Sequence, residues 1–264
     1  MALNGDSRIL EALAADGIAK QKLHVIMIVD TSRSMQGDRI GQVNSAIADI
    51  HKYLVDLQSE NTNVDFYVSI MTFANGASFL PGYKGVNVNN MTPPNLKAIG
   101  YSNLHCAYEE LEPMLHKESN GGMMPDFGGV APIILLLTDG HPTKSTEKEL
   151  EKLKKLPWFR ASLRYGIAIE LRDEKTMRVL TDFTDDKDCV IECMDTTMLA
   201  KIIQIIVLTA SKVKSQSSAV RANNAAKASI QRADRSVSVQ PSDAHTIVKQ
   251  QVKATLDEVD DWEW

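Results

Sequence analysis

Two stretches of the chain place oxygen-bearing side chains directly after long apolar runs. The run at 25–29 is followed by Asp-Thr-Ser-Arg-Ser, and the run at 133–137 is followed by Thr-Asp-Gly. A continuous apolar run is typical of a parallel strand that is buried on both faces. Side chains that leave the carboxyl ends of such strands meet at the ligand crevice of an open α/β sheet. The side chains that we expect there are Asp30, Ser32, Ser34 and Asp139.

Carboxylates and hydroxyls are hard oxygen ligands, which suit Mg²⁺ or Mn²⁺ and suit zinc poorly. A further hydroxyl comes from Ser102, in the loop Gly-Tyr-Ser-Asn-Leu at 100–104. The combination of Asp-x-Ser-x-Ser, a hydroxyl in a Gly-x-Ser/Thr-x-Leu loop, and Thr-Asp-Gly after a later strand resembles the von Willebrand factor A (vWA) domain. In that family the pattern forms the metal-ion-dependent adhesion site (MIDAS). The resemblance extends over about residues 22–212, with serine at 102 where many members have threonine.

The resemblance implies how the site would bind a metal ion. Ser32, Ser34 and Ser102 would coordinate it directly, whereas Asp30 and Asp139 would act largely through water. The remaining open position would accept an Asp or Glu of a protein partner, so that the metal bridges two proteins. An alternative is that Asp30 and Ser32 cap the following helix, although capping leaves Asp139 unexplained.

Three neighbouring polar residues have less specific expectations. We expect Asp38 and Arg39 to shape the start of the helix after the first loop. Asn103 would either orient Ser102 or cap the helix that follows it.

The apolar periodicity predicts a doubly wound α/β fold, in which a mostly parallel six-stranded sheet has helices on both faces. The predicted strands are 23–29, 64–73, 77–80, 131–138, 162–170 and 188–192. The predicted helices are 7–16, 39–58, 103–117, 146–155, 174–181 and 196–214.

The composition divides the chain into four predicted parts. Residues 1–21 form an N-terminal helical extension and residues 22–214 form the vWA domain. Residues 215–245 are rich in Ser, Ala, Asn and Arg, which predicts a flexible linker. Residues 246–264 combine a short amphipathic helix with an acidic tail that contains Trp262 and Trp264. Because tryptophan often fills a partner's pocket, we expect this tail to dock on a partner or on a neighbouring copy; the alternative is a solubilising extension.

Bulk properties exclude several classes of function. The 264 residues carry a net charge of −5 without a basic stripe, so we expect no nucleic-acid partner. No apolar run approaches a signal peptide core or a membrane span, and three cysteines are an odd number without a disulfide framework. We therefore expect a cytoplasmic protein that is not membrane-bound. The P-loop and Gly-x-Ser-x-Gly motifs are also absent from the sequence, so we expect a binding protein and not an enzyme.

Further residues resemble TerY-type proteins of bacterial tellurium-resistance and stress-response clusters. They are Phe73-Ala74, the loop before Ser102, the segment 135–140, and the segment 166–169 followed by a helix with Leu180. This resemblance implies a scaffold or adaptor in a stress-response or phosphosignalling complex, with a protein kinase and a PP2C-type phosphatase as partners. Two other classes stay open, namely the metal-site subunit of a chelatase-like AAA+ ATPase assembly and a metal-dependent hydrolase.

Overall fold

The computed structural model describes residues 20–60, 64–126, 130–170, 173–193 and 198–209. It also describes Thr246, Gln250, Lys253 and Ala254, all four of which are helical. The predicted helix 7–16, the linker 215–245, and Trp262 and Trp264 lie outside these residues, as does most of the predicted helix after residue 245.

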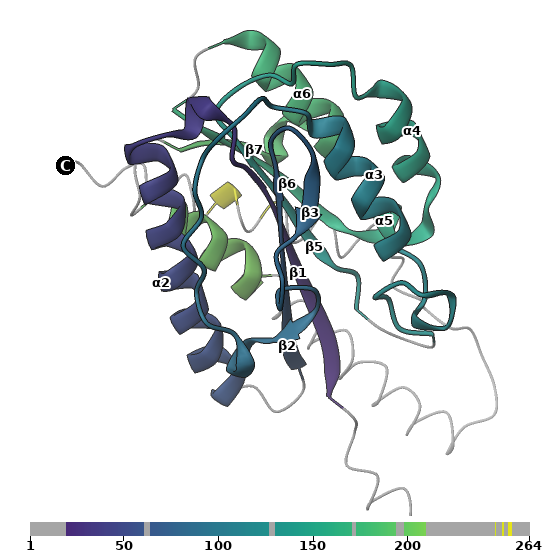
Figure 1. Ribbon diagram of the computed structural model, residues 1–264. Coiled ribbons are helices and arrows are strands. Elements are labelled where there is room, and N and C mark those ends of the chain that lie inside the picture. The colour runs from purple at the N-terminus through teal and green to yellow at the C-terminus, as the bar shows by residue number, and fades with distance from the viewer. Residues whose placement is uncertain are drawn as a thin grey trace, which may run out of the picture.

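The described chain forms a central sheet with helices on both faces (Figure 1). The strands are β1 (Gln21–Asp30), β2 (Val64–Phe73), β3 (Ala77–Phe79), β4 (Val86–Asn87), β5 (Ile133–Thr138), β6 (Leu163–Ile169) and β7 (Val190–Cys193). The α-helices are α2 (Asp38–Glu60), α3 (Leu104–Met114), α4 (Glu147–Lys155), α5 (Pro157–Ala161) and α6 (Glu174–Thr184), and residues 198–209 form a further helix. No helix in the described part is long and apolar enough to cross a membrane.

The strand order is β3-β2-β1-β5-β6-β7, and all neighbours are parallel except β3, which is antiparallel to β2. The predicted doubly wound, mostly parallel α/β fold is confirmed, and all six predicted strands are present. A seventh strand, β4, also pairs with β2 in antiparallel orientation. Sequence reasoning missed β4 because two residues are too few to show a period.

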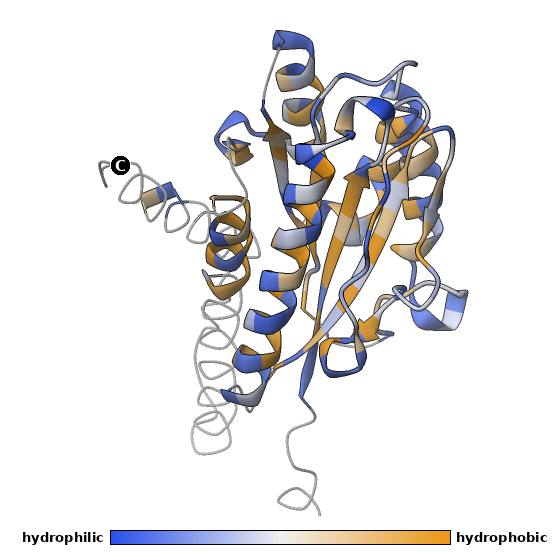
Figure 2. Ribbon diagram, turned by 60° about the vertical axis from the view of Figure 1, so that its left-hand side comes forward, coloured by the Kyte–Doolittle hydropathy of each residue, from blue (hydrophilic) through white to orange (hydrophobic). Residues whose placement is uncertain are grey.

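Strand β1 lies in the middle of the sheet and is buried from Leu23 to Asp30. Successive side chains of a strand point to opposite faces. Accordingly Val25, Met27 and Val29 pack with α2 and the helix 198–209, whereas Ile26 and Ile28 pack with the helices α3 to α6. Figure 2 shows the apolar strands enclosed between helices whose hydrophilic sides face outward. Because β1 is packed between the helices of both faces, its carboxyl end is held at a fixed place at the edge of the sheet.

The helices depart from the prediction in several places: α2 and α6 end two and three residues later than predicted, at Glu60 and Thr184. Helix α3 ends at Met114, three residues earlier than predicted, with Pro113 in its last turn. Proline has no N–H for the helical ladder and disfavours the helical conformation in the residue before it, so it promotes an early end. Helix α5 was not predicted, because its five residues are too few for a helical period.

One buried histidine is expected to make the domain sensitive to acid. His24, on β1, is 4% exposed, and neither ring nitrogen has a hydrogen-bond partner in the structure. Burial, and secondarily the charge of Lys22, lowers the pKa of His24 from 6.5 to about 4. The folded domain therefore keeps this imidazole neutral under conditions in which the unfolded chain protonates it.

We expect the free energy of unfolding to fall as the pH decreases from about 6.5 to about 4. In this window the unfolded chain binds a proton at His24 that the folded chain does not bind. This difference lowers the free energy of unfolding by up to about 3 kcal/mol. Urea unfolding of the wild type and of His24→Gln, measured across this range, isolates the contribution of His24. The variant should show the shallower pH dependence, and parallel curves for the two proteins would contradict the assignment.

Candidate metal centre

The site begins where two neighbouring parallel strands end. In the pairing of β1 with β5, Val29 lies opposite Leu137. The next residues of the two strands are Asp30 and Thr138, and the Thr138 hydroxyl donates a 2.7 Å hydrogen bond to Asp30 Oδ2. Asp139 follows directly, so both predicted aspartates leave the same edge of the sheet. Both are buried.

Asp30 collects three donors. Its Oδ1 accepts the backbone N–H of Ser32 at 2.8 Å. Its Oδ2 accepts the Thr138 hydroxyl and, at 3.0 Å, the hydroxyl of Ser102 from the loop before α3. The carboxylate therefore ties together three segments that are distant in the sequence.

The two serines of the first loop extend this network to Asp139. Ser34 Oγ donates to Asp139 Oδ1 at 2.7 Å, and the Oγ atoms of Ser32 and Ser34 are 3.0 Å apart. All five predicted residues thus lie in one hydrogen-bonded group, as the sequence predicted. They are Asp30, Ser32, Ser34, Ser102 and Asp139.

The spacing of these oxygens fits the shell of a small divalent cation. Octahedral Mg²⁺ holds oxygens at about 2.0–2.1 Å, so that neighbouring ligands are about 3 Å apart. The Oγ atoms of Ser32 and Ser34 have this separation. The described residues contain no group of three or more His, Cys, Asp or Glu placed to hold a metal ion. A metal at this site would therefore depend on serine hydroxyls, and such a site suits Mg²⁺ or Mn²⁺ better than zinc.

Burial also makes the site receptive to positive charge. It raises the pKa of Asp30, while the hydrogen bonds from Thr138, Ser32 and Ser102 act in the opposite direction. A charged carboxylate in a dry site is stabilised by a nearby cation. Binding a divalent ion would offset the cost of keeping Asp30 ionised.

Helix capping does not explain these residues. Helix α2 begins at Asp38, well after Asp30 and Ser32, and Ser32 makes no side-chain capping bond to the short turn η1 (Arg33–Met35). Asn103 occupies the expected N-cap position of α3, but its side chain makes no capping hydrogen bond and donates to the carbonyl of Asn75. The backbone carbonyl of Ser102 accepts a hydrogen bond from the backbone N–H of Thr143, at 2.8 Å. The loop before α3 is therefore bonded to the loop after β5.

The loop that carries Ser102 is fixed by its backbone. Gly100 has φ +97°, a conformation that favours glycine, and a Cβ there would lie 2.7 Å from Asn75 Oδ1. Its carbonyl accepts from Arg33 N at 3.0 Å, and Ile99 N donates to Thr31 O at 2.7 Å. Ser102 is thus placed by contacts with the loop after β1 and the turn after β2.

Sequence reasoning missed a contact of Arg39, which was expected only to shape the helix start. Arg39 Nη1 donates to Asp139 Oδ2 and to Ser34 O, both at 2.7 Å, and its Nε donates to Glu170 Oε2 at 2.8 Å. The Arg39 side chain is 9% exposed. The motif gave no signal for this contact, because Glu170 is 131 residues away along the chain.

This arginine sets the charge balance of the site. Asp139 uses one oxygen for Ser34 and the other for Arg39, so its rotamer is held from both sides. The arginine charge partly neutralises Asp139, and Glu170 balances part of the arginine charge. Glu170 adopts φ +48°, which is uncommon for a non-glycine residue. A fixed positive charge therefore lies next to the oxygens that would hold a metal ion.

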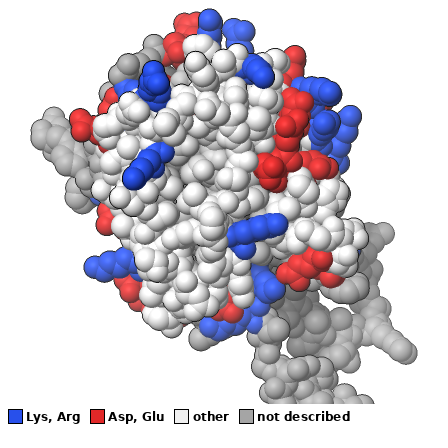
Figure 3. All heavy atoms as spheres, in the orientation of Figure 1, with Lys and Arg blue, Asp and Glu red and all other residues white. Residues whose placement is uncertain are grey.

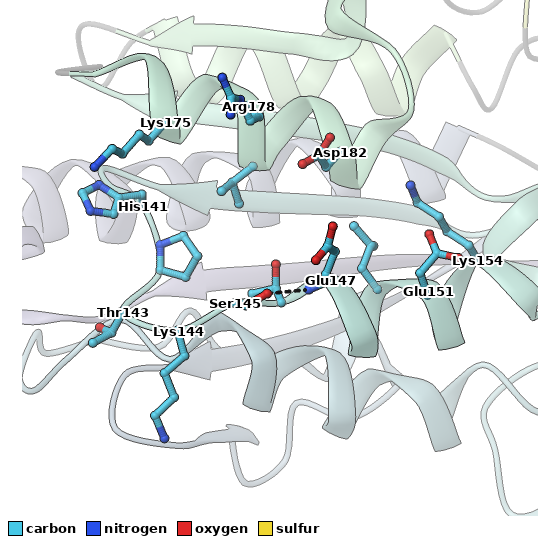
Figure 4. A pocket seen from close by; sticks show the side chains of 14 residues that line it. His141, Thr143, Lys144, Ser145, Glu147, Glu151, Lys154, Lys175, Arg178 and Asp182 are labelled. Atoms are coloured by element: carbon cyan, nitrogen blue, oxygen red, sulfur yellow. Dashed lines mark hydrogen bonds between the residues drawn. The ribbon is translucent and has the colours of Figure 1, made fainter.

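A hollow of about 480 Å³ lies beside this site, between α4 and α6 (Figure 4). Its lining begins with His141, two residues after Asp139, and continues along both helices. His141 is exposed, and its Nδ1 lies 3.3 Å from Asp173 Oδ2. The lining mixes basic and acidic side chains, so it adds no single charge preference next to the metal site.

The profile of the von Willebrand factor type A domain family matches residues 24–205. The chain belongs to this family. The match includes the carboxyl ends of both strands that meet at the site and all three loops that carry its oxygens.

Comparison with known proteins gives distant relatives. The inter-alpha-trypsin inhibitor heavy chains H1 of Bos taurus and Sus scrofa are 26% and 27% identical to this vWA chain over 151 residues. Each match covers 53% of this chain and 15% of the relative. This chain therefore corresponds to a small part of their length.

Solved structures support the same fold. A von Willebrand factor type A protein from Catenulispora acidiphila has a TM-score of 0.53 at 13% identity, covering 72% of this chain and 43% of that chain. Proximal thread matrix protein 1 from the mussel byssus has a TM-score of 0.52 at 16% identity, covering 73% and 48%. The pilus adhesin SpaC from Lactobacillus rhamnosus GG in its open conformation has a TM-score of 0.53 at 14% identity, covering 69% and 29%. At these identities the similarity shows the fold.

We expect Arg39→Met to lower the free energy of unfolding by about 3 kcal/mol, because it leaves the buried Asp139 carboxylate without its cationic partner. Arg39→Lys should cost less, since it keeps the charge but loses the fork that reaches both Asp139 and Glu170. Thermal unfolding without divalent cations would measure both. Lys52→Met, at an exposed position of the same helix, is the matched control, and an equal loss in Lys52→Met and Arg39→Met would contradict the role of the ion pair.

Proposed function

We propose that this protein is a metal-dependent protein-interaction module of the MIDAS type. A Mg²⁺ or Mn²⁺ ion would be held by Asp30, Ser32, Ser34, Ser102 and Asp139, and an Asp or Glu of a partner protein would complete its shell. The observation that carries the proposal is the single hydrogen-bonded group of oxygens, with the two serine hydroxyls 3.0 Å apart. Hydroxyl ligands leave most of the metal's charge available to an incoming carboxylate.

The charges around the site support an external ligand. Asp30 and Asp139 supply two negative charges, but Arg39 neutralises part of the second. A divalent ion is then incompletely balanced by the protein itself. A carboxylate from outside would supply the missing charge and would be attracted in proportion to metal occupancy.

The same contacts favour binding over catalysis. Ser34 and Ser102 donate to carboxylates that are buried in the domain, and His141 pairs with Asp173. A serine nucleophile is most often activated by a histidine base, and no histidine in the described part makes a hydrogen bond to these serines. We therefore propose a module that is not an enzyme; turnover that disappears with Asp30→Asn would favour the hydrolase alternative.

We further propose that the module acts in the cytoplasm as a scaffold or adaptor in a stress-response or phosphosignalling complex. The support is the sequence resemblance to TerY-type proteins, which extends the proposal to a protein kinase and a PP2C-type phosphatase as partners and to tellurite resistance. A subunit of a chelatase-like AAA+ ATPase assembly is the alternative. Co-purification with a hexameric ATPase, and not with a kinase, would favour that alternative.

We expect calorimetry to show one binding event for Mg²⁺ or Mn²⁺. Asp30→Asn and Asp139→Asn should each weaken binding by at least about tenfold, since each removes a charge worth more than about 1.4 kcal/mol to a divalent ion. Asp38→Asn, which removes an exposed carboxylate from the start of α2, is the matched control. Unchanged binding in both site variants, with the fold retained by circular dichroism, would refute the assignment.

We expect capture of a protein partner to require both the metal and an acidic side chain of that partner. Partner recovery on the immobilised full chain should be lost in EDTA, restored by Mg²⁺, and absent with Asp139→Asn. Neutralising the partner's metal-binding Asp or Glu should have the same effect as EDTA. Capture that resists chelation would place the interface elsewhere on the domain.

A further inference from the structure

Two large hydrophobic side chains are conspicuously exposed beside the metal centre. Among the described residues, Ile99 is 69% exposed and Tyr101 is 71% exposed. They flank Gly100, and Tyr101 directly precedes Ser102. An exposed apolar pair next to a metal site is a candidate contact surface for a ligand.

The backbone of this exposed hydrophobic pair is rigidly held. Ile99 N donates to Thr31 O at 2.7 Å, and Tyr101 N donates to the side chain of Asn75 at 2.9 Å. The chain is thus pinned to two other loops while the two side chains project into solvent. A backbone that is already held in place loses little further freedom on binding, which favours affinity.

The surroundings of the pair define the chemistry of its ligand. Residues 85–103 contain a single charged residue, Lys97. Figure 3 shows a broad uncharged area on the face along which this connection runs. Lys97 and Arg33, from the loop after β1, are exposed and make no ion pair with another described residue. A fitting ligand therefore has a carboxylate for the metal, large apolar groups beside it, and further negative charge.

One segment of this chain has that composition. Residues 257–264 read Asp-Glu-Val-Asp-Asp-Trp-Glu-Trp. Side chains alternate between the two sides of an extended backbone. In that conformation Asp260, Trp262 and Trp264 share one side, and Asp261 and Glu263 share the other. One side would offer a carboxylate followed by two indoles, and the other would offer two more acids.

The described end of the chain lies within reach of the site. Lys253 Nζ is 3.5 Å from Asp188 Oδ1, just before β7. Strand β7 is two strands from β5, and Asp139 lies at about the level of Cys193. With strands about 4.8 Å apart and about 3.3 Å per residue, Asp188 and Asp139 are separated by about 19 Å. Lys253 and Ala254 are helical, and the six residue steps from 254 to 260 span at least about 20 Å when extended.

We propose that the acidic segment 257–264 binds the metal-site edge of its own domain. The Asp260 carboxylate takes the open metal position, Trp262 and Trp264 pack on Ile99 and Tyr101, and the remaining acids face Arg33 and Lys97. This inference rests on the proposed metal-binding function. Because the segment is tethered, its effective concentration is high and a weak contact is enough to occupy the site. A partner carboxylate must then displace the segment, so the tail sets a threshold for partner binding.

The three tryptophans of the chain provide the test. Mn²⁺ broadens the nuclear resonance signals of groups near it, whereas Mg²⁺ does not. Trp158 lies on α5, before the start of β6, and thus at the sheet edge opposite the metal centre. In the full chain at sub-stoichiometric Mn²⁺, the indole N–H signals of Trp262 and Trp264 should be lost while that of Trp158 persists. Mg²⁺ should leave all three sharp.

Matched variants separate this contact from general proximity. Asp260→Asn should restore sharp tail indole signals, whereas Asp261→Asn, which removes the same charge from the other side, should not. Ile99→Ser with Tyr101→Ser should also restore them at equal Mn²⁺ occupancy. If calorimetry shows Mn²⁺ binding and the tail indoles stay sharp in the wild type, the tail does not occupy the site and the proposed function stands. If Mn²⁺ does not bind at all, the proposed function itself fails. Broadening that grows with protein concentration would overturn the intramolecular placement in favour of a second copy's tail.

Discussion

The candidate site depends on the parallel pairing of β1 with β5 at the centre of the sheet. This pairing brings Asp30 and Thr138 to the same edge at hydrogen-bonding distance, and Asp139 follows without any loop between. A slip of one residue in this pairing would move Thr138 away from Asp30 and break the hydrogen bond that joins the two strand ends. The three loops then add hydroxyls to a pair of carboxylates whose separation is set by the core.

Much of the fold could be predicted because its central strands are long and uninterruptedly apolar. The runs at 25–29 and 133–137 can satisfy their burial only inside a covered parallel sheet. The elements that were missed, β4 and α5, have two and five residues. These two short elements are stabilised by tertiary contacts with neighbouring elements, and a short window of sequence does not show such contacts.

The candidate metal site likewise has features that the local sequence predicts and features that it does not. The oxygen-bearing side chains of the site could be predicted, since each follows a strand or a glycine at the spacing of the vWA metal-site motif. Arg39 and Glu170 could not be paired from sequence, because their contact arises when the start of α2 and the end of β6 meet in space. The exposure of Ile99 and Tyr101 was equally hidden, since apolar residues in a loop are as often buried. Local spacing therefore predicts the ligands, whereas the charge and the apolar surface around them emerge from tertiary structure.

Glu170 shows a conflict between backbone and side chain at one position. Glycine would adopt its φ of +48° without strain, but glycine has no carboxylate for Arg39. The chain thus keeps a conformation that costs of order 1 kcal/mol or more in return for a balanced charge at Asp139. Replacing Glu170 with glycine would relieve this strain, but it would also remove one of the two carboxylates that the nearly buried Arg39 contacts. The carboxylate at position 170 is therefore kept against the preference of the backbone, and the charge beside the metal site depends on it.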